Sequence, residues 1–203
     1  MVTLYFPTNT NEDALAVREA HLSTIRRLGG SEDAILDVQL NLTISYQTLG
    51  RLEDANQMYR DVYSGWLKLN GEHHNTLIAA NNYANSLLCL KSFEEAKSLL
   101  RKTMPVAQRV LGESNELTLR MRWHYARALY EDTGTTLDAV REAVTTLEES
   151  DRIARRVFGG THPLTVDIEH SLQTARAVLA DREAGKTVVF LPGRLPGGRV
   201  ADK

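Results

Sequence analysis

Histidines and a cysteine are the residues of this 203-residue sequence best suited to metal binding or catalysis. No histidine pair stands at metal-ligand spacing beside a cysteine, and the adjacent His73 and His74 cannot easily face one ion. We therefore expect the histidines to be turn and surface residues, and we expect no metal site. The six histidines are His21, His73, His74, His124, His162 and His170.

Nucleophilic catalysis has no support in the remaining residues. The single cysteine, Cys89, stands among Leu87, Leu88 and Leu90, which is typical of a small packed residue, and no motif places a base beside it. The sequence contains no Gly-x-Ser-x-Gly, His-Glu-x-x-His or paired-carboxylate arrangement. It therefore predicts no enzyme, no cofactor and no small-molecule substrate.

Two short matches to functional motifs fail when their surroundings are considered. Gly185-Lys186-Thr187 resembles the end of a phosphate-binding loop, but Ala180 stands where that loop requires a glycine, and a predicted helix precedes it instead of a strand. Asn41-Leu42-Thr43 matches a glycosylation acceptor, yet it lies inside a predicted helix and the chain starts without a secretion signal. Neither match predicts a function.

The balance of charge limits the classes of partner. Lysine and arginine number 24 against 26 aspartate and glutamate residues, so the net charge is -2 and no general basic field could attract nucleic acid or anionic lipid. No run approaches the roughly 18 apolar residues that a membrane helix needs. With one cysteine and no secretion signal, we expect a cytoplasmic protein that binds neither nucleic acid nor membrane.

The strongest pattern in the sequence is an internal repeat. Two independent columns of residues recur, the first at spacings of 41, 41 and 47 residues and the second at 41, 42 and 47. The first column is Glu12-Asp13-Ala14, Glu53-Asp54-Ala55, Glu94-Glu95-Ala96 and Arg141-Glu142-Ala143. The second is Leu28-Gly29-Gly30, Leu69-Asn70-Gly71, Leu111-Gly112-Glu113 and Phe158-Gly159-Gly160. The longer third spacing predicts extra residues near 132–138, which most simply lengthen a turn.

Between the columns, apolar residues follow helical spacing. Leu52, Ala55, Tyr59, Val62 and Trp66 are three or four residues apart, which places them on one face of a helix. Each unit is therefore a shorter helix A, a turn, a longer helix B and a glycine-containing turn that ends helix B. The chain has the order B, A-B, A-B, A-B, A, and the alanine of the first column allows helices to cross closely.

This organisation divides the chain into three parts. We expect an N-terminal extension over residues 1–11, a repeat region over 12–184 and a flexible tail rich in glycine and proline over 185–203. The expected units lie near 12–30, 31–71, 72–113 and 114–160, and a capping helix covers 163–183. The predicted fold class is all-α, a solenoid of helix-turn-helix repeats with a period of 41–42 residues and one longer copy.

The segment from Phe158 to Val166 carries a family likeness. Its sequence Phe-Gly-Gly-Thr-His-Pro-Leu-Thr-Val resembles the Leu-Gly-x-x-His-Pro-x-Thr-Leu turn of kinesin light chain-type tetratricopeptide repeats (TPR), and Glu95-Ala96 and Glu142-Ala143 resemble the start of that family's helix B. The likeness covers roughly residues 12 to 183. It implies a right-handed superhelical solenoid whose A helices line a concave groove that holds an extended peptide.

Polar residues gather on one face of the predicted A helices. Asparagine is an indifferent helix former, but its amide can bond a peptide main chain, and arginine can clamp a carboxylate. Arg120 and Arg127 flank His124, and such stacked like charges repel unless an anion is near. Each polar residue could instead merely hydrate this face, and Trp123 could pack against the next helix. The predicted groove residues are Asn41, Asn81, Asn82, Asn85, Arg120, Trp123, His124 and Arg127.

The sequence thus predicts a scaffold or adaptor that binds a protein or peptide partner, for which an acidic or polar segment fits the arginines. The alternative is a structural element that stacks on neighbours in a larger assembly, linked only by analogy to motor and cargo transport.

Overall fold

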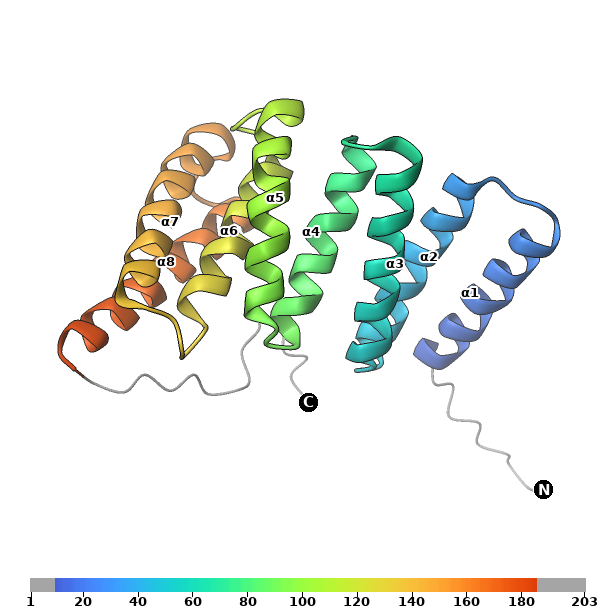
Figure 1. Ribbon diagram of the computed structural model, residues 1–203, viewed down its shortest axis with the longest axis horizontal. Helices are drawn as coiled ribbons and strands as arrows, with labels where there is room; N and C mark the ends of the chain where they lie inside the picture. The colour runs from blue at the N-terminus through green and yellow to red at the C-terminus, as the bar shows by residue number, and fades with distance from the viewer. Residues whose placement is uncertain (1–9, 186–203) are drawn as a thin grey trace, which may run out of the picture. The chain divides into compact units, whose positions relative to one another are not determined.

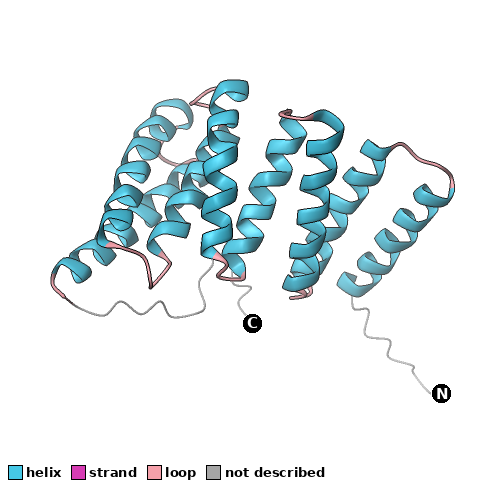
Figure 2. Ribbon diagram, viewed as in Figure 1, coloured by secondary structure: helices cyan, strands magenta, loops and turns pink. Residues whose placement is uncertain are grey.

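Within residues 10–185, which the computed structural model describes, all regular secondary structure is α-helical (Figure 2). The helices are α1 (Thr10–Arg27), α2 (Glu32–Thr48), α3 (Leu52–Asn70), α4 (His74–Cys89), α5 (Phe93–Leu111), α6 (Glu116–Tyr130), α7 (Leu137–Phe158) and α8 (Pro163–Glu183). This confirms the predicted all-α fold class. Residues 186–203 of the tail expected over 185–203, and most of the N-terminal extension, lie outside the described residues.

The helices form two compact units, each with its own packing. Unit 1 contains α1 to α4 and ends at Leu90, and unit 2 begins at Lys91 and contains α5 to α8. Within each unit, successive helices run antiparallel and pack against one another (Figure 1). In unit 2, α6 also contacts α8 directly. The predicted A helices are α2, α4, α6 and α8, and the predicted B helices are α1, α3, α5 and α7.

Local sequence signals account for the helix ends. Gly71 and Gly112 follow α3 and α5 with φ angles of 59° and 91°, a left-handed region that glycine enters without steric cost. At the start of α6, the Asn115 side chain accepts a hydrogen bond of 2.9 Å from the Leu117 amide. The α6–α7 loop covers residues 131–136 and is longer than the other A-to-B turns, as the spacing predicted, but residues 137 and 138 already belong to α7, which is longer than α5.

The apolar stripes form the cores of the units. In unit 1, Leu36, Val62, Trp66 and Ala79 of three successive helices form one buried cluster. Gly65 permits the close crossing of α2 and α3, because a Cβ atom there would lie 2.5 Å from a Leu36 methyl carbon. Three of the four alanines of the predicted column, Ala55, Ala96 and Ala143, have no exposed surface, whereas Ala14 of α1 is only partly buried.

One polar contact recurs between a B helix and the following A helix in both units. In unit 1, Arg60 Nε donates to the Tyr83 hydroxyl at 3.1 Å. In unit 2, the equivalent Arg101 Nε donates to the Tyr125 hydroxyl at the same distance, and that hydroxyl donates to Glu142 at 2.7 Å. Because the two arginines are 41 residues apart and the two tyrosines 42, this link follows the repeat period.

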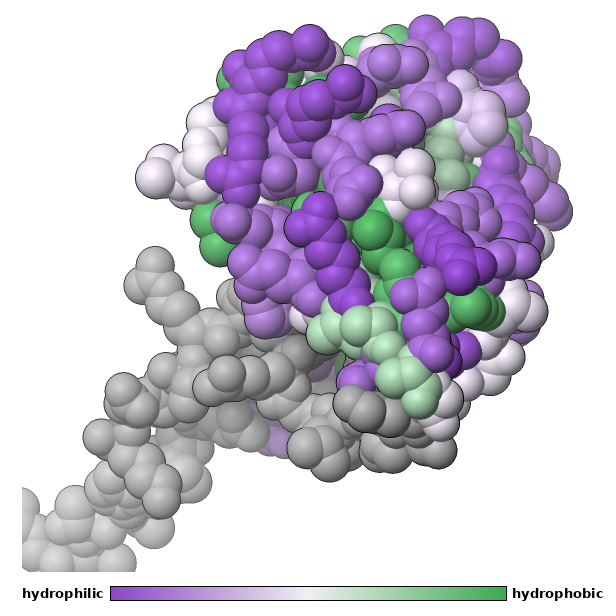
Figure 3. Space-filling view, turned by 90° about the vertical axis from the view of Figure 1, so that its left-hand side faces the viewer, coloured by the Kyte–Doolittle hydropathy of each residue, from purple (hydrophilic) through white to green (hydrophobic). Residues whose placement is uncertain are grey.

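The side of unit 2 formed by α7 and α8 is mainly hydrophilic in its visible part (Figure 3). The buried side chains of α8 include Ile168, Leu172 and Ala175, which form its apolar stripe. Its exposed Arg176 pairs with Glu148 of α7 at 2.7 Å.

Candidate functional site

The eight residues predicted to face a partner lie on A helices of both units. Asn41 is on α2 and three asparagines are on α4, all in unit 1, whereas the other four residues belong to α6 of unit 2. The predicted groove residues of each unit therefore have surroundings of their own.

In unit 1, the α4 asparagines differ in burial. Asn81 is buried, and its Oδ1 atom has no hydrogen-bond partner within residues 10–185. Its Nδ2 atom donates weakly to Asn82 Oδ1 at 3.4 Å. Asn82 and Asn85 are half-buried, and Asn41 of α2 is exposed. The accessible amides of this set are therefore those of Asn41, Asn82 and Asn85.

In unit 2, Arg120 is the most accessible of the predicted groove residues. Its guanidinium donates to Glu116 Oε1, one helical turn earlier, through Nε at 3.0 Å and Nη2 at 2.7 Å. The Arg120 side chain retains 36% of its exposure, so water screens this ion pair strongly. The guanidinium can therefore exchange Glu116 for another carboxylate at small cost.

Arg127 and Trp123 lie deeper than expected for groove residues. The Arg127 side chain pairs with Glu131 at 2.6 Å, and its guanidinium carbon lies 5.3 Å from the centroid of the Trp123 ring system. Trp123 Nε1 donates to Ser171 of α8 at 2.7 Å. Trp123 therefore packs against the next A helix, which is the alternative to a position in an open groove.

These contacts correct one premise of the groove prediction. The stacked arginines do not require an external anion, because Glu116 and Glu131 each lie one turn away and neutralise one of them. Glu116 stands four residues before Arg120 in the sequence, and Glu131 stands four residues after Arg127. An electrostatic argument for an acidic partner therefore applies only to the accessible Arg120.

His124 lies between the two arginines and is only 5% exposed, so the expectation that all histidines are turn or surface residues was wrong for it. Burial, followed by the charges of Arg127 and Arg120, lowers the pKa of His124 to about 3. The ring is therefore neutral at physiological pH. Its Nδ1 atom has no hydrogen-bond partner in the part of the chain that the structure describes.

Two further polar side chains of unit 2 belong to the same region, and neither is among the predicted groove residues. Burial raises the pKa of Asp167 on α8, whereas the nearby Arg120 and Arg127 lower it. Burial also raises the pKa of Tyr130 to about 12. Asp167 follows Arg120 by 47 residues, the longer repeat spacing, but nothing in the sequence indicates how far α8 covers α6.

The lengthened α6–α7 loop is held from two sides. Arg182 of α8 donates to the backbone carbonyl oxygens of Asp132, Thr133 and Thr135. The buried Lys97 of α5 pairs with the Asp132 carboxylate at 3.1 Å. The loop is thus fixed by backbone and side-chain contacts within unit 2.

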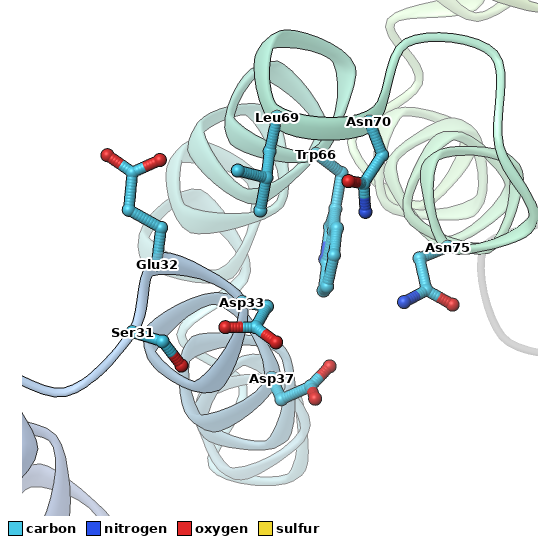
Figure 4. Close-up of a pocket in the computed structure, with 8 residues that line it drawn as sticks. All are labelled: Ser31, Glu32, Asp33, Asp37, Trp66, Leu69, Asn70 and Asn75. Atoms are coloured by element: carbon cyan, nitrogen blue, oxygen red, sulfur yellow. The ribbon is translucent and has the colours of Figure 1, made fainter.

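Unit 1 contains a separate hollow of about 470 Å³ where the start of α2, the end of α3 and the start of α4 meet (Figure 4). Asp37 and Asn75 point toward one another across it, and the Trp66 side chain extends into it, while Glu32 points away. The residues that line the hollow are Ser31, Glu32, Asp33, Asp37, Trp66, Leu69, Asn70 and Asn75.

The described residues contain neither a cluster of metal-ligating side chains nor a helix that could cross a membrane. Within residues 10–185, no three histidine, cysteine, aspartate or glutamate side chains are grouped so that they could hold a metal ion. None of the eight described helices combines the length and the apolar character that crossing a membrane requires.

Comparison with known proteins identifies the repeat. The tetratricopeptide repeat family model matches residues 35–75 and 76–116, which are consecutive segments of 41 residues. This confirms the period read from the two columns across these segments.

Curated relatives share the sequence over most of this chain but are much longer. The chain is 26% identical over 188 residues to a clustered mitochondria protein homolog of Ajellomyces capsulatus, covering 88% of this chain and 15% of that protein. It is 25% identical over 201 residues to the homolog of Coccidioides immitis, covering 95% of this chain and 15% of that protein. The chain thus spans about 15% of the length of these relatives.

Solved structures share the fold. The TPR-like repeats of a Podosopora anserina protein assigned as a kinesin light chain match with a TM-score of 0.71 and 22% identity, covering 86% of this chain and 81% of that one. BtubC (BKLC) of P. vanneervenii matches with a TM-score of 0.57 and 16% identity, covering 96% and 82%. The helix order, the period and the family match agree: residues 35–116 of this chain match two tetratricopeptide repeats, and the chain shares its fold with the TPR-like repeats of these solved structures.

Proposed function

We propose that this chain is a scaffold for protein–protein interaction and that exposed faces of its A helices bind an extended segment of a partner protein. A tetratricopeptide fold is typically a non-enzymatic scaffold, and its repeats provide long surfaces for a partner chain. The proposal assigns the contacts of unit 1 to the accessible polar residues of α2 and α4, and those of unit 2 to the accessible Arg120 of α6.

The asparagines of α4 are the observation that carries the proposal. Asn85 has no hydrogen bond within the described residues, and Asn82 has only the long contact with Asn81. Each asparagine is less favourable in a helix than alanine by roughly 0.5 kcal/mol. The fold gains little from these amides, whereas a bound main chain could use both their donors and their acceptors.

Unit 2 contributes a charge to the same function. Arg120 can bond a carboxylate of the partner in place of Glu116, because both side chains of that pair are partly exposed. Trp123, His124 and Arg127 form the buried support beneath this position. The proposed partner segment is accordingly polar or acidic where it meets α6.

Binding to an array of 15-residue peptides tests this function. The wild-type protein should bind a defined subset of peptides, and the double variant Asn82→Ala/Asn85→Ala should lose that binding by tenfold or more. The same variant should melt at an equal or higher temperature, because alanine favours the helix. Loss of binding without loss of stability would separate a contact residue from a structural one.

A matched control is Gln173→Ala, which removes an exposed amide from the outer face of α8. It should leave peptide binding unchanged. If the α4 variant binds like the wild type, the asparagines only hydrate the surface. The alternative role, stacking within a larger assembly, would then be favoured.

A further inference from the structure

The hollow of unit 1 contains a carboxylate that the fold does not explain. Glu32 and Asp33 stand in the first turn of α2, where negative charge stabilises a helix N-terminus. Hydrogen bonds from Ser31 and from the Ala34 amide lower the pKa of Asp33. Asp37 lies beyond that first turn, and it forms no ion pair or hydrogen bond within residues 10–185.

Trp66 provides a second and independent observation. Its side chain lines the hollow although the residue is only 2% exposed. Within the described residues, no hydrogen bond reaches its indole N–H, and this donor is not one of the fully buried polar atoms that lack a partner, so it retains contact with solvent at the hollow. A ligand in this hollow could supply that acceptor, for example with a peptide carbonyl.

The remaining lining completes a site of mixed character. Asn70 and Asn75 carry amides that have no hydrogen bond among the described residues. Leu69 is 39% exposed beside them and offers an apolar surface. A few polar groups that converge on a partly apolar hollow are typical of a binding site.

From these groups we infer that the hollow binds a basic side chain, an arginine or a lysine, of a partner protein. The aliphatic stem would lie against Leu69 and the edge of Trp66, and the cationic head would meet Asp37 and Asp33. A backbone carbonyl of the same partner segment would accept from the Trp66 indole. This site is distinct from the amides of α4 and from Arg120, and it does not depend on the function proposed for them.

Proton–nitrogen correlation NMR of the full chain tests this inference directly. The chain has two tryptophans, Trp66 and Trp123, so its spectrum has two indole N–H signals, which Trp66→Phe and Trp123→Phe assign. The probes are the capped peptides acetyl-Ala-Ala-Arg-Ala-Ala-amide and the same peptide with citrulline, a neutral isostere of arginine. The arginine peptide should shift the Trp66 signal in a saturable manner and leave the Trp123 signal unchanged.

Three comparisons decide the outcome. The citrulline peptide should bind the wild-type protein at least tenfold more weakly than the arginine peptide. Asp37→Asn should weaken the binding of the arginine peptide at least fivefold. Glu53→Gln makes an equal change of charge at the opposite end of α3, and its affinity for the arginine peptide should stay within twofold of the wild type. An unmoved Trp66 signal, equal binding of both peptides, or equal losses in the two variants would overturn the assignment. Asp37 is exposed, so the Asp37→Asn variant should fold like the wild type. Unchanged dispersion of its NMR signals verifies this.

Discussion

Acid should destabilise unit 2 through one residue, His124. Burial, together with Arg127 and Arg120, lowers its pKa in the folded protein from 6.5 to about 3. Between these values the unfolded chain binds a proton that the folded chain excludes. The contribution of the neutral, buried ring is therefore complete above about pH 6.5 and is lost as the pH falls from there toward 3.

The size of the effect follows from the two pKa values. A pH of 5.5 is one unit below the pKa of 6.5 of the imidazole in the unfolded chain. Protonation of this imidazole therefore stabilises the unfolded chain by about 1.4 kcal/mol. At pH 7.5 the same contribution is less than about 0.1 kcal/mol. The free energy of unfolding should thus fall by about 1.3 kcal/mol from this residue alone between pH 7.5 and 5.5.

Urea unfolding at pH 7.5, 6.5 and 5.5 measures this loss. With Trp66→Phe as the background, fluorescence reports Trp123, which is adjacent to His124 in sequence and has its ring centroid 5.0 Å from the imidazole. The comparison variant, His124→Gln, cannot gain a proton in this range. Between pH 7.5 and 5.5, its free energy of unfolding should therefore fall by about 1.3 kcal/mol less than that of the protein with His124, whatever its stability at pH 7.5.

Parallel pH dependences for the two proteins would refute this reasoning. They would mean that His124 reaches solvent in the folded state, so that both states bind the proton alike. An exposed histidine, His21→Gln of α1, serves as the control and should leave the pH dependence of Trp123 unfolding unchanged.

Three further perturbations test the packing and the helix ends. Ala96→Leu should destabilise the protein by roughly 1 to 3 kcal/mol in chemical denaturation, because Ala96 has no exposed surface; an unchanged midpoint would mean that the site tolerates overpacking. His162 caps α8 by accepting a hydrogen bond of 3.3 Å from the Leu164 amide, so His162→Ala should lower the free energy of unfolding by about 0.5 to 2 kcal/mol. Asparagine caps α6, so His162→Asn should retain most of the stability. Arg182→Ala should speed hydrogen exchange in the α6–α7 loop and the last turn of α8, and equal protection in wild type and variant would contradict the proposed anchoring.

The repeat could be predicted from the sequence because its signals are local. Helical spacing of apolar residues, glycine after each B helix and polar caps act within a few residues, so α8 was expected over Pro163–Glu183, where the structure has it. The buried alanines Ala55 and Ala96 repeat with the same period, because every unit makes the same close crossing. The ion-pair partners Glu116 and Glu131 also stand at local spacing and could have been found with the arginines they neutralise.

Tertiary structure alone decided which polar residues face solvent. His124 and Arg120 lie on the same helix face one turn apart, yet one is buried and the other is half-exposed, because α8 contacts α6 and helical periodicity carries no information about that cover. The hollow has the same origin: Asp37, Trp66 and Asn75 come from three helices and meet only through the packing of unit 1. Sequence spacing specifies the face of each helix, whereas the accessibility of a side chain depends on the neighbouring helix that packs over that face.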